Sequence, residues 1–190
     1  IAYAEGDTSH EGWTELTKDI LESTYKVSSQ FGDDYKLPDG HYYLGEDISS
    51  DKSIDIGGVV TLDLNGYELE HDSNSGTLLY PDYSSTLTLI DSSSAKTGKV
   101  ISKTGVAVNL MTSSKLNANG GTIEGNVDLT ADNAVIDNTD PLNITVFRAG
   151  QIESGSSSAD IKGGVFYSTV DEYYGQITGG TFYGIVSGAG

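Results

Sequence analysis

GGTIEGNV at residues 120–127, GGVFYSTV at residues 163–170 and GGTFYGIV at residues 179–186 are three versions of one short pattern. In each version a glycine pair is followed by Thr or Val, then by a large apolar residue, and a valine closes the unit. The large apolar residues are Ile123, Phe166 and Phe182. A unit this short buries an apolar face only by stacking on its neighbours, so the repetition predicts a β-solenoid.

The spacing of the three units indicates which kind of solenoid to expect. Gly164 and Gly180 are 16 residues apart, whereas Gly121 and Gly164 are 43 apart, which fits two larger turns of the same coil. Such uneven spacing favours a right-handed, single-stranded parallel β-helix, whose loops vary in length, over a strict hexapeptide solenoid. An antiparallel sandwich is the alternative fold, but similar units running in the same direction fit stacked turns better than hairpins.

Short alternating runs between the glycine units supply the remaining strands. Val60, Leu62 and Leu64 alternate with polar residues, and Leu87 and Leu89 repeat the pair Leu62/Leu64 with an offset of 25 residues. The same alternation predicts strands near residues 42–44, 106–110, 127–129, 134–136 and 144–146. Alternation of this kind places every second side chain on the same face of a strand.

The N-terminal part of the chain has a different periodicity. Trp13, Leu16 and Ile20 have helical spacing and predict an amphipathic α-helix that caps the first turn of the coil. Leu37-Pro38-Asp39-Gly40 is a turn signal, which we expect to open the coil. The predicted organisation is a polar lead-in at 1–11, the capping helix and a linker at 12–36, and the β-helix at 37–190.

Two observations bear on localisation. Ala2-Tyr3-Ala4 fits the small-x-small pattern at which signal peptidases cleave, so the lead-in is expected to be a remnant of a secretion signal. No apolar run approaches the length that spans a membrane. The sequence therefore predicts a secreted or cell-surface protein that does not insert into a membrane.

The amino-acid composition excludes several kinds of bond and partner. The chain has no cysteine, which excludes disulfides and Cys-ligated metals, and its 24 glycines against 3 prolines suit many tight turns. Its net charge of −18 repels phosphate backbones, anionic lipid headgroups and polyanionic polysaccharides that lack bridging calcium. Nucleic acid is therefore not an expected partner.

The sequence resembles a group of bacterial extracellular proteins. The motifs VTLDLNGYEL (60–69), STLTLIDSS (85–93) and the GGTF-type unit at 179–182, after the predicted N-terminal helix that contains Trp13, are similar to right-handed β-helix proteins of the pectin-lyase-like superfamily. The resemblance covers residues 12–190, and proteins of this group are common as surface proteins of Firmicutes. It implies the fold and a non-catalytic branch of the superfamily, and it says little about chemistry.

Catalytic chemistry is not favoured by the residues present. A polysaccharide lyase needs a base and cations beside the substrate carboxylate, and Arg148 is the single arginine of the chain. A glycoside hydrolase needs paired carboxylates. The candidate pairs are Asp63 with Asp91, Asp128 with Asp132, and Asp137 with Asp140. Because the chain has 28 acidic residues, such pairs arise by chance, and solvated surface carboxylates are the favoured interpretation.

Metal and nucleophile sites are also not predicted. Asp132, Asp137 and Asp140 supply oxygen ligands around one loop, but they lack EF-hand spacing, so we expect no cofactor and leave a loop calcium open. His10 in the lead-in and His41 and His71 at turns are interpreted as exposed residues, and no G-x-S-x-G motif is present.

The candidate ligand-binding residues are tyrosines. Tyr167 and Tyr183 each follow a core phenylalanine, so alternation points both outward, one above the other, with Tyr173 and Tyr174 nearby. One interpretation is a flat platform that stacks on sugar rings. The other, which we favour, is a ladder that stabilises neighbouring turns.

The sequence thus predicts a non-enzymatic β-helix module for interaction or adhesion, with an extracellular glycan or protein as its partner. The alternative is a carbohydrate-active enzyme, either a glycoside hydrolase or a polysaccharide lyase, on the same fold. Gly188-Ala189-Gly190 follow the last unit without an evident cap, so self-association through an open C-terminal turn is a further expectation.

Overall fold

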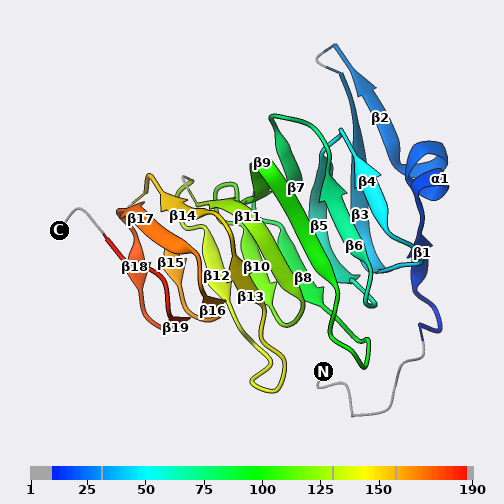
Figure 1. Ribbon diagram of the computed structural model, residues 1–190. Coiled ribbons are helices and arrows are strands. Elements are labelled where there is room, and N and C mark those ends of the chain that lie inside the picture. The colour runs from blue at the N-terminus through cyan, green and yellow to red at the C-terminus, as the bar shows by residue number, and fades with distance from the viewer. Residues whose placement is uncertain (1–9, 31, 130, 157, 188–190) are drawn as a thin grey trace.

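The computed structural model describes residues 10–30, 32–129, 131–156 and 158–187. The protein is all-β, and its strands form one long sheet of 19 strands that winds along a single axis (Figure 1). Among the residues that the structure describes, the only helical segment lies at one end of this coil and the last strands lie at the other. None of the helices in these ranges is long and apolar enough to cross a membrane.

The helical segment consists of α1 (Lys18–Ile20) and the π-helical turn η1 (Leu21–Tyr25). The strands are β1 (Thr14–Leu16), β2 (Lys26–Ser29), β3 (Gly32–Leu44), β4 (Ile48–Ser50), β5 (Ile54–Asp63), β6 (Glu68–His71), β7 (Thr77–Pro81), β8 (Thr86–Ile90), β9 (Lys99–Asn109), β10 (Lys115–Ala118), β11 (Thr122–Asp128), β12 (Val135–Asp137), β13 (Val146–Arg148), β14 (Gln151–Ser154), β15 (Asp160–Ile161), β16 (Val165–Phe166), β17 (Thr169–Tyr173), β18 (Gln176–Ile177) and β19 (Thr181–Phe182).

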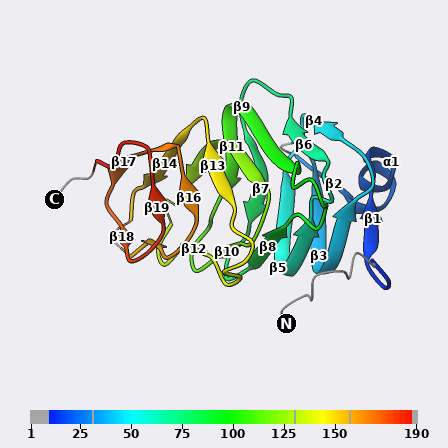
Figure 2. The same ribbon diagram turned by 60° about the horizontal axis from the view of Figure 1, so that its bottom comes forward.

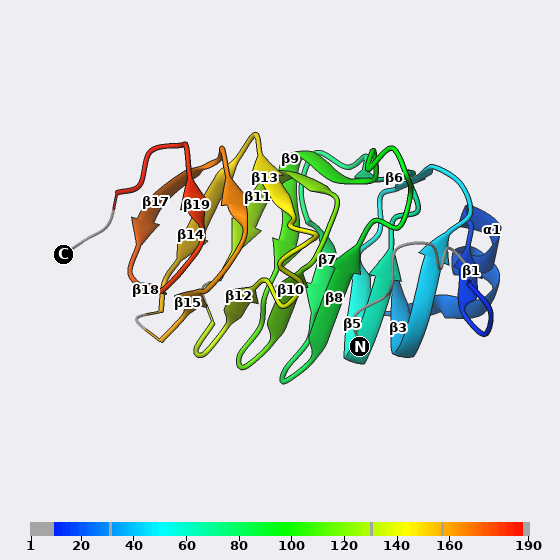
Figure 3. The same ribbon diagram turned by 90° about the horizontal axis from the view of Figure 1, so that it is seen from below.

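The strand pairings define three faces. On the first face β1, β3, β5, β8, β10, β12, β15 and β18 pair in that order, and Figure 3 shows most of them side by side. The second face consists of β4, β6, β9, β11, β13, β16 and β19 (Figure 2). The third consists of β3, β5, β7, β9, β11, β14 and β17.

All of these pairings are parallel, and the one antiparallel pairing between described strands joins β2 to β3. Strands β3, β5, β9 and β11 are long enough to turn a corner and serve two faces. Gly125 lies at the corner within β11, where its φ of 142° and a backbone oxygen only 2.5 Å from the site of a Cβ both favour glycine. This topology is consistent with the predicted parallel β-helix.

The three glycine units occupy equivalent places on the second face, as the repeat predicts. Ile123, Phe147, Phe166 and Phe182 are register partners in successive turns, so the spacing of 43 residues does correspond to two turns. The phenylalanine rings stack along the axis at 4.5 Å and 4.7 Å between centroids. Ile123 and Phe166 are fully buried, and Phe182 packs against the same core. Burial of each large side chain contributes roughly 1.5–3 kcal/mol.

One predicted register is wrong by two residues. Val60 pairs with Leu87, and Leu62 pairs with Leu89, so equivalent positions are 27 residues apart and not 25. A strand has a period of two, and a shift of two residues leaves the same side chains facing the core. Alternation alone therefore does not distinguish the two registers.

The predicted start of the N-terminal helix is also wrong. Thr14–Leu16 is strand β1, in which Leu16 pairs with Leu44 and is buried, and the helix begins only at Lys18. Thr17 is the N-cap, because its hydroxyl accepts a hydrogen bond from the backbone N–H of Ile20 at 3.3 Å. Pairing with β3 gives the segment a backbone partner that an isolated helix would not have, so tertiary contacts override the helical spacing.

The turn predicted at residues 37–40 lies inside strand β3. It forms the corner at which β3 passes from the third face to the first, between Pro38 and Gly40, where the register with β5 shifts. Tyr35 and Leu37 are fully buried, so the coil already includes part of the segment predicted to be a linker. The predicted division into domains stays a prediction, and most of the lead-in (1–9) lies outside the described residues.

Candidate functional site

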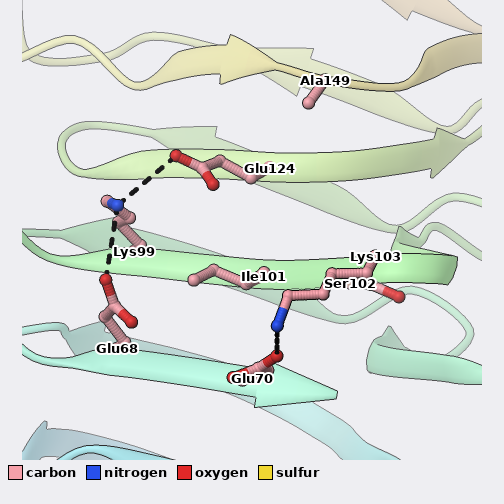
Figure 4. A pocket seen from close by; sticks show the side chains of 8 residues that line it. All are labelled: Glu68, Glu70, Lys99, Ile101, Ser102, Lys103, Glu124 and Ala149. Atoms are coloured by element: carbon pink, nitrogen blue, oxygen red, sulfur yellow. Dashed lines mark hydrogen bonds and ion pairs between the residues drawn. The ribbon is translucent and has the colours of Figure 1, made fainter. Parts of the chain in front are cut away.

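The outer side of the second face carries a shallow hollow of about 370 Å³ (Figure 4). It lies over β6, β9 and β11, whose alternate residues Leu69, Val100 and Ile123 are directed into the core. The intervening residues are therefore on the outer side. The lining residues are Glu68, Glu70, Lys99, Ile101, Ser102, Lys103, Glu124 and Ala149.

The hollow combines an apolar residue with charged neighbours. Ile101 lies on β9 between Glu70 and Glu124 of the adjacent strands and is only 8% exposed. Lys99 Nζ is 3.3 Å from Glu68 Oε1 and 3.6 Å from Glu124 Oε1, so it bridges three turns (Figure 4). The hydrogen bond to Glu68 and the charge of Glu124 raise the pKa of Lys99, which keeps this amine charged.

A second ion pair borders the other side of the hollow. Lys103 Nζ lies 2.5 Å from Glu70 Oε1, and this hydrogen bond raises the pKa of Lys103. The lysines and glutamates of the hollow alternate in sign, so their charges largely compensate each other. Because the pairs are exposed, they contribute little to stability, and their polar atoms can exchange partners with a ligand.

The predicted tyrosine stack is present on the same face. Tyr167 and Tyr183 follow β16 and β19, and their rings stack with centroids 4.8 Å apart and planes 12° apart. They are 47% and 65% exposed, so the prediction that both point outward is confirmed. Arg148 Cζ lies 4.6 Å from the centre of the Tyr167 ring, a cation–π contact. Arg148 in turn pairs in register with Glu124 of the hollow.

The direction of stacking limits what the tyrosines offer to a ligand. Arg148 precedes Tyr167 by one turn and Tyr183 follows it by one turn, so the two ring faces of Tyr167 are both covered. The rings stand edge-on to solvent, and the outer face of Tyr183 is the ring face left open by this stack. A platform two rings wide is therefore not formed, whereas the ladder interpretation fits the geometry.

The other two tyrosines do not join this stack. Tyr174 is 54% exposed, but it follows β17 while Tyr167 precedes it. The strand separates the two by roughly 15 Å, at about 3.3 Å per residue. Tyr173 ends β17, and its side chain lies outside the described part of the chain. The role of all four tyrosines in ligand binding stays a prediction.

Asp63 and Asp91 are buried, which corrects their interpretation as solvated surface carboxylates. They are 1% and 2% exposed. Asp63 Oδ1 accepts hydrogen bonds from the backbone N–H groups of Asn65 and Ser92 at 2.8 and 2.9 Å. Asp91 accepts from Gly66 N–H at 2.9 Å through Oδ1 and from Gly98 N–H at 2.7 Å through Oδ2. Both carboxylates therefore join successive turns, a structural role.

Three of the remaining candidate carboxylates, Asp132, Asp137 and Asp140, also have partners in the structure. Asp137 Oδ2 lies 3.0 Å from Lys115 Nζ, and Asp132 Oδ1 accepts a hydrogen bond from the Ser156 hydroxyl at 2.6 Å. The hydrogen bond from the Asn143 side chain lowers the pKa of Asp140. Within the described ranges, no group of three His, Asp or Glu side chains is placed to hold a metal ion.

Two of the three histidines differ from the prediction. His71 is buried in β6, where Nδ1 accepts a hydrogen bond from the Ser73 N–H at 3.2 Å. The His10 ring stacks on Tyr43 at 4.0 Å, and its Nε2 lies 2.8 Å from Asp63 Oδ2. Only His41 is an exposed histidine as expected. The local sequence pattern did not reveal the contacts of His10, because Tyr43 and Asp63 lie far from it in the sequence.

A second hollow lies on the third face and contains carboxylates. It has a volume of about 310 Å³ and is lined by Asp34, Ser53, Asp55, Thr77 and Tyr80. Burial raises the pKa of Asp55, and the negative charges of Asp34 and Asp82 add to this effect. Burial also raises the pKa of Tyr80, whose hydroxyl lies 2.9 Å from Met111 Sδ.

The fold and its surface define a class: a parallel β-solenoid with a charged hollow and an aromatic stack on the outside of one face. Comparison with protein-family models, with curated proteins and with solved structures finds no match to this chain. We therefore infer the function from the geometry of these residues.

Proposed function

We propose that the protein is a secreted or cell-surface, non-enzymatic β-helix module that binds an extracellular partner, with glycans as the favoured ligands. The observation that carries this proposal is the outer strip of the second face. There the hollow around Ile101 continues through Glu124 and Arg148 to the stacked tyrosines 167 and 183. An exposed strip of this kind suits an extended ligand better than a small molecule.

The chemistry of the strip fits sugars. A sugar ring has an apolar face and a polar edge, and the open face of Tyr183 complements the former. Arg148 can donate hydrogen bonds to the polar edge of such a ring. Of the described carboxylates, none forms an ion pair with Arg148, so its N–H groups are available to hydroxyl or carboxylate oxygens of a ligand.

The handedness of the coil and the role of its helical end are also proposals. We propose that the coil is right-handed and single-stranded, and that the chain is related to pectin-lyase-like surface proteins. We also propose that α1 and η1 cap the first turn, because Leu21 is fully buried and Ile20 and Tyr25 pack against the core. The lead-in at 1–11 is then the remnant of a secretion signal.

The test is binding to a glycan array followed by titration of the best ligand with a tyrosine variant. Tyr183→Ala removes the open ring face, and a loss of about tenfold in affinity is expected from one stacking contact. Tyr83→Ala is the matched control, because Tyr83 is also 65% exposed but belongs to the turn that joins β7 on the third face to β8 on the first. Equal binding by the two variants would contradict a role for the strip.

The alternative function is a carbohydrate-active enzyme, and the hollow beside Asp55 favours it as the second candidate. A carboxyl group with a raised pKa beside a second carboxylate has the character of a general acid. The assay is release of reducing ends from plant and host polysaccharides by the wild type and by Asp55→Asn. Release that Asp55→Asn abolishes would replace the first proposal with this one.

A further inference from the structure

The outward side chains of the second face form two rows that run along the coil. The first row has one residue in each of five successive turns: Glu70, Ile101, Glu124, Arg148 and Tyr167. The second row lies beside it and consists of Glu68, Lys99, Thr122, Val146 and Val165. Figure 4 shows three turns of the first row, with Ile101 between Glu70 and Glu124. Successive turns are about 4.8 Å apart, so the rows are roughly 19 Å long.

The spacing of these rows matches the repeat of one kind of ligand. In an extended chain of β-linked pyranoses, each sugar adds a length close to the spacing between turns of the coil. A glycan of this kind that lies along the coil therefore presents one sugar to every turn, in the same relation to the two rows. A glycan whose linkages make it curve stays in step with the rows over a much shorter length.

The charges along these rows cancel each other. The carboxylates and cations of the two rows and the adjacent lysine are Glu68, Glu70, Glu124, Lys99, Lys103 and Arg148. Lys99 pairs with Glu68 and Glu124. Lys103 pairs with Glu70. This surface is therefore neutral, although the chain as a whole has a net charge of −18. Paired charges can hydrogen-bond to hydroxyl groups, whereas a polyanionic glycan is repelled by the field of the whole chain.

The rows also contain an apolar surface beside polar groups. Val146 and Val165 are register partners on β13 and β16, and both are half-buried on the outer side of the sheet. Arg148 and Tyr167 lie next to them in the first row and contact each other. Such a surface can accept the C–H face of a sugar ring while its polar neighbours reach the hydroxyl groups.

We infer that the ligand of the second face is an uncharged, extended β-linked glycan, which lies along the coil with one sugar on each turn. This inference rests on the proposed function and names the class of glycan. The length of the glycan and the geometry of its linkages are then the properties that the two rows select, and its charge is not.

The experiment is calorimetric titration of the 190-residue chain with β-1,4-linked glucose oligomers of increasing length. We expect the affinity to rise with each added sugar up to about five and then to level off, because each row covers five turns. The affinity should change by less than about twofold between low and high salt, because the surface is neutral. An α-1,4-linked glucose oligomer of equal length, which curves, should bind about tenfold more weakly.

The outcomes separate this inference from the proposed function. Equal affinity for the α- and β-linked oligomers, an affinity that does not rise beyond two sugars, or a steep dependence on salt would overturn the inference and leave glycan binding in place. Binding only to other members of the glycan array would do the same. No binding to any glycan would contradict the proposed function as well.

A matched pair of variants locates the contact. Val146→Lys places a charge in the second row, and its desolvation should lower the affinity for the five-sugar β-linked oligomer by about tenfold. Val135→Lys is the control, because Val135 is also a half-buried outward valine of a three-residue strand, on the first face. Circular dichroism checks that both variants are folded, and the length series on the wild type needs no variant. Unchanged binding by Val146→Lys, or an equal loss in Val135→Lys, would overturn the inference.

Discussion

Replacement of Phe166 by alanine tests whether the phenylalanine ladder holds the C-terminal turns together. The Phe166 ring is fully buried between Phe147 at 4.5 Å and Phe182 at 4.7 Å. Loss of a buried phenylalanine costs roughly 3–5 kcal/mol, because both the transfer free energy and a cavity contribute. Phe182 has only one stacking partner among the described rings and is partly exposed, so Phe182→Ala should cost about half as much.

The position of the single tryptophan makes the location of the effect measurable. Trp13 lies at the N-terminal end, where its ring is 5.0 Å from that of His41, so its fluorescence reports on the first turns. Turns of a solenoid contact only their neighbours, so the loss should be local. In urea, we expect Phe166→Ala to lower the midpoint followed by circular dichroism more than the midpoint followed by Trp13 fluorescence. A cost below about 1 kcal/mol, or one equal to that of Phe182→Ala, would refute the reasoning.

Three further substitutions test single side-chain contacts and one corner of the coil. Asp91→Ala removes the acceptor for three backbone N–H groups, those of Gly66, Ser93 and Gly98, and should lower stability by about 3 kcal/mol, measured as a change in urea midpoint. Gly125→Ala should lower the melting temperature far more than Gly12→Ala, because both have positive φ but only the Gly125 site is crowded, and equal losses would contradict this. A hydrogen bond from Tyr35 lowers the pKa of Glu22 to about 2, so its contribution to stability is complete above about pH 4.5 and is lost as pH falls through about 2. The melting temperature of Glu22→Gln should therefore fall less between pH 5 and pH 2 than that of the wild type.

The repeated glycine units were sufficient to predict the stacking, because each unit fixes a strand, a corner and an inward residue. Ile123, Phe166 and Phe182 lie where the pattern placed them. The alternating pattern could not determine the strand register that pairs Leu62 with Leu89. A shift by two residues leaves the same side chains on the inner face of the strand. Strand β1 was missed for another reason: its partner β3 lies about 28 residues further along the chain, and local spacing holds no information on that contact.

The candidate site was predicted only in part. The outward stack of Tyr167 on Tyr183 follows from two equal positions in two units. The hollow around Ile101 brings together three turns of unequal length, and no repeat marks its residues. Asp63 and Asp91 did carry a signal, because each accepts a hydrogen bond from the backbone N–H two residues later, a turn that Asp-x-Asn and Asp-x-Ser sequences favour.

Because each turn of the coil contacts only its neighbours, nothing in the interior fixes the number of turns. Residues 163–178 make up one complete turn, and the turn after it repeats the same inward ladder. An in-frame duplication of these 16 residues would add one strand to every face and lengthen the rod by about 4.8 Å. The length of the coil is thus a property that tandem duplication can adjust one turn at a time, without redesign of the interior.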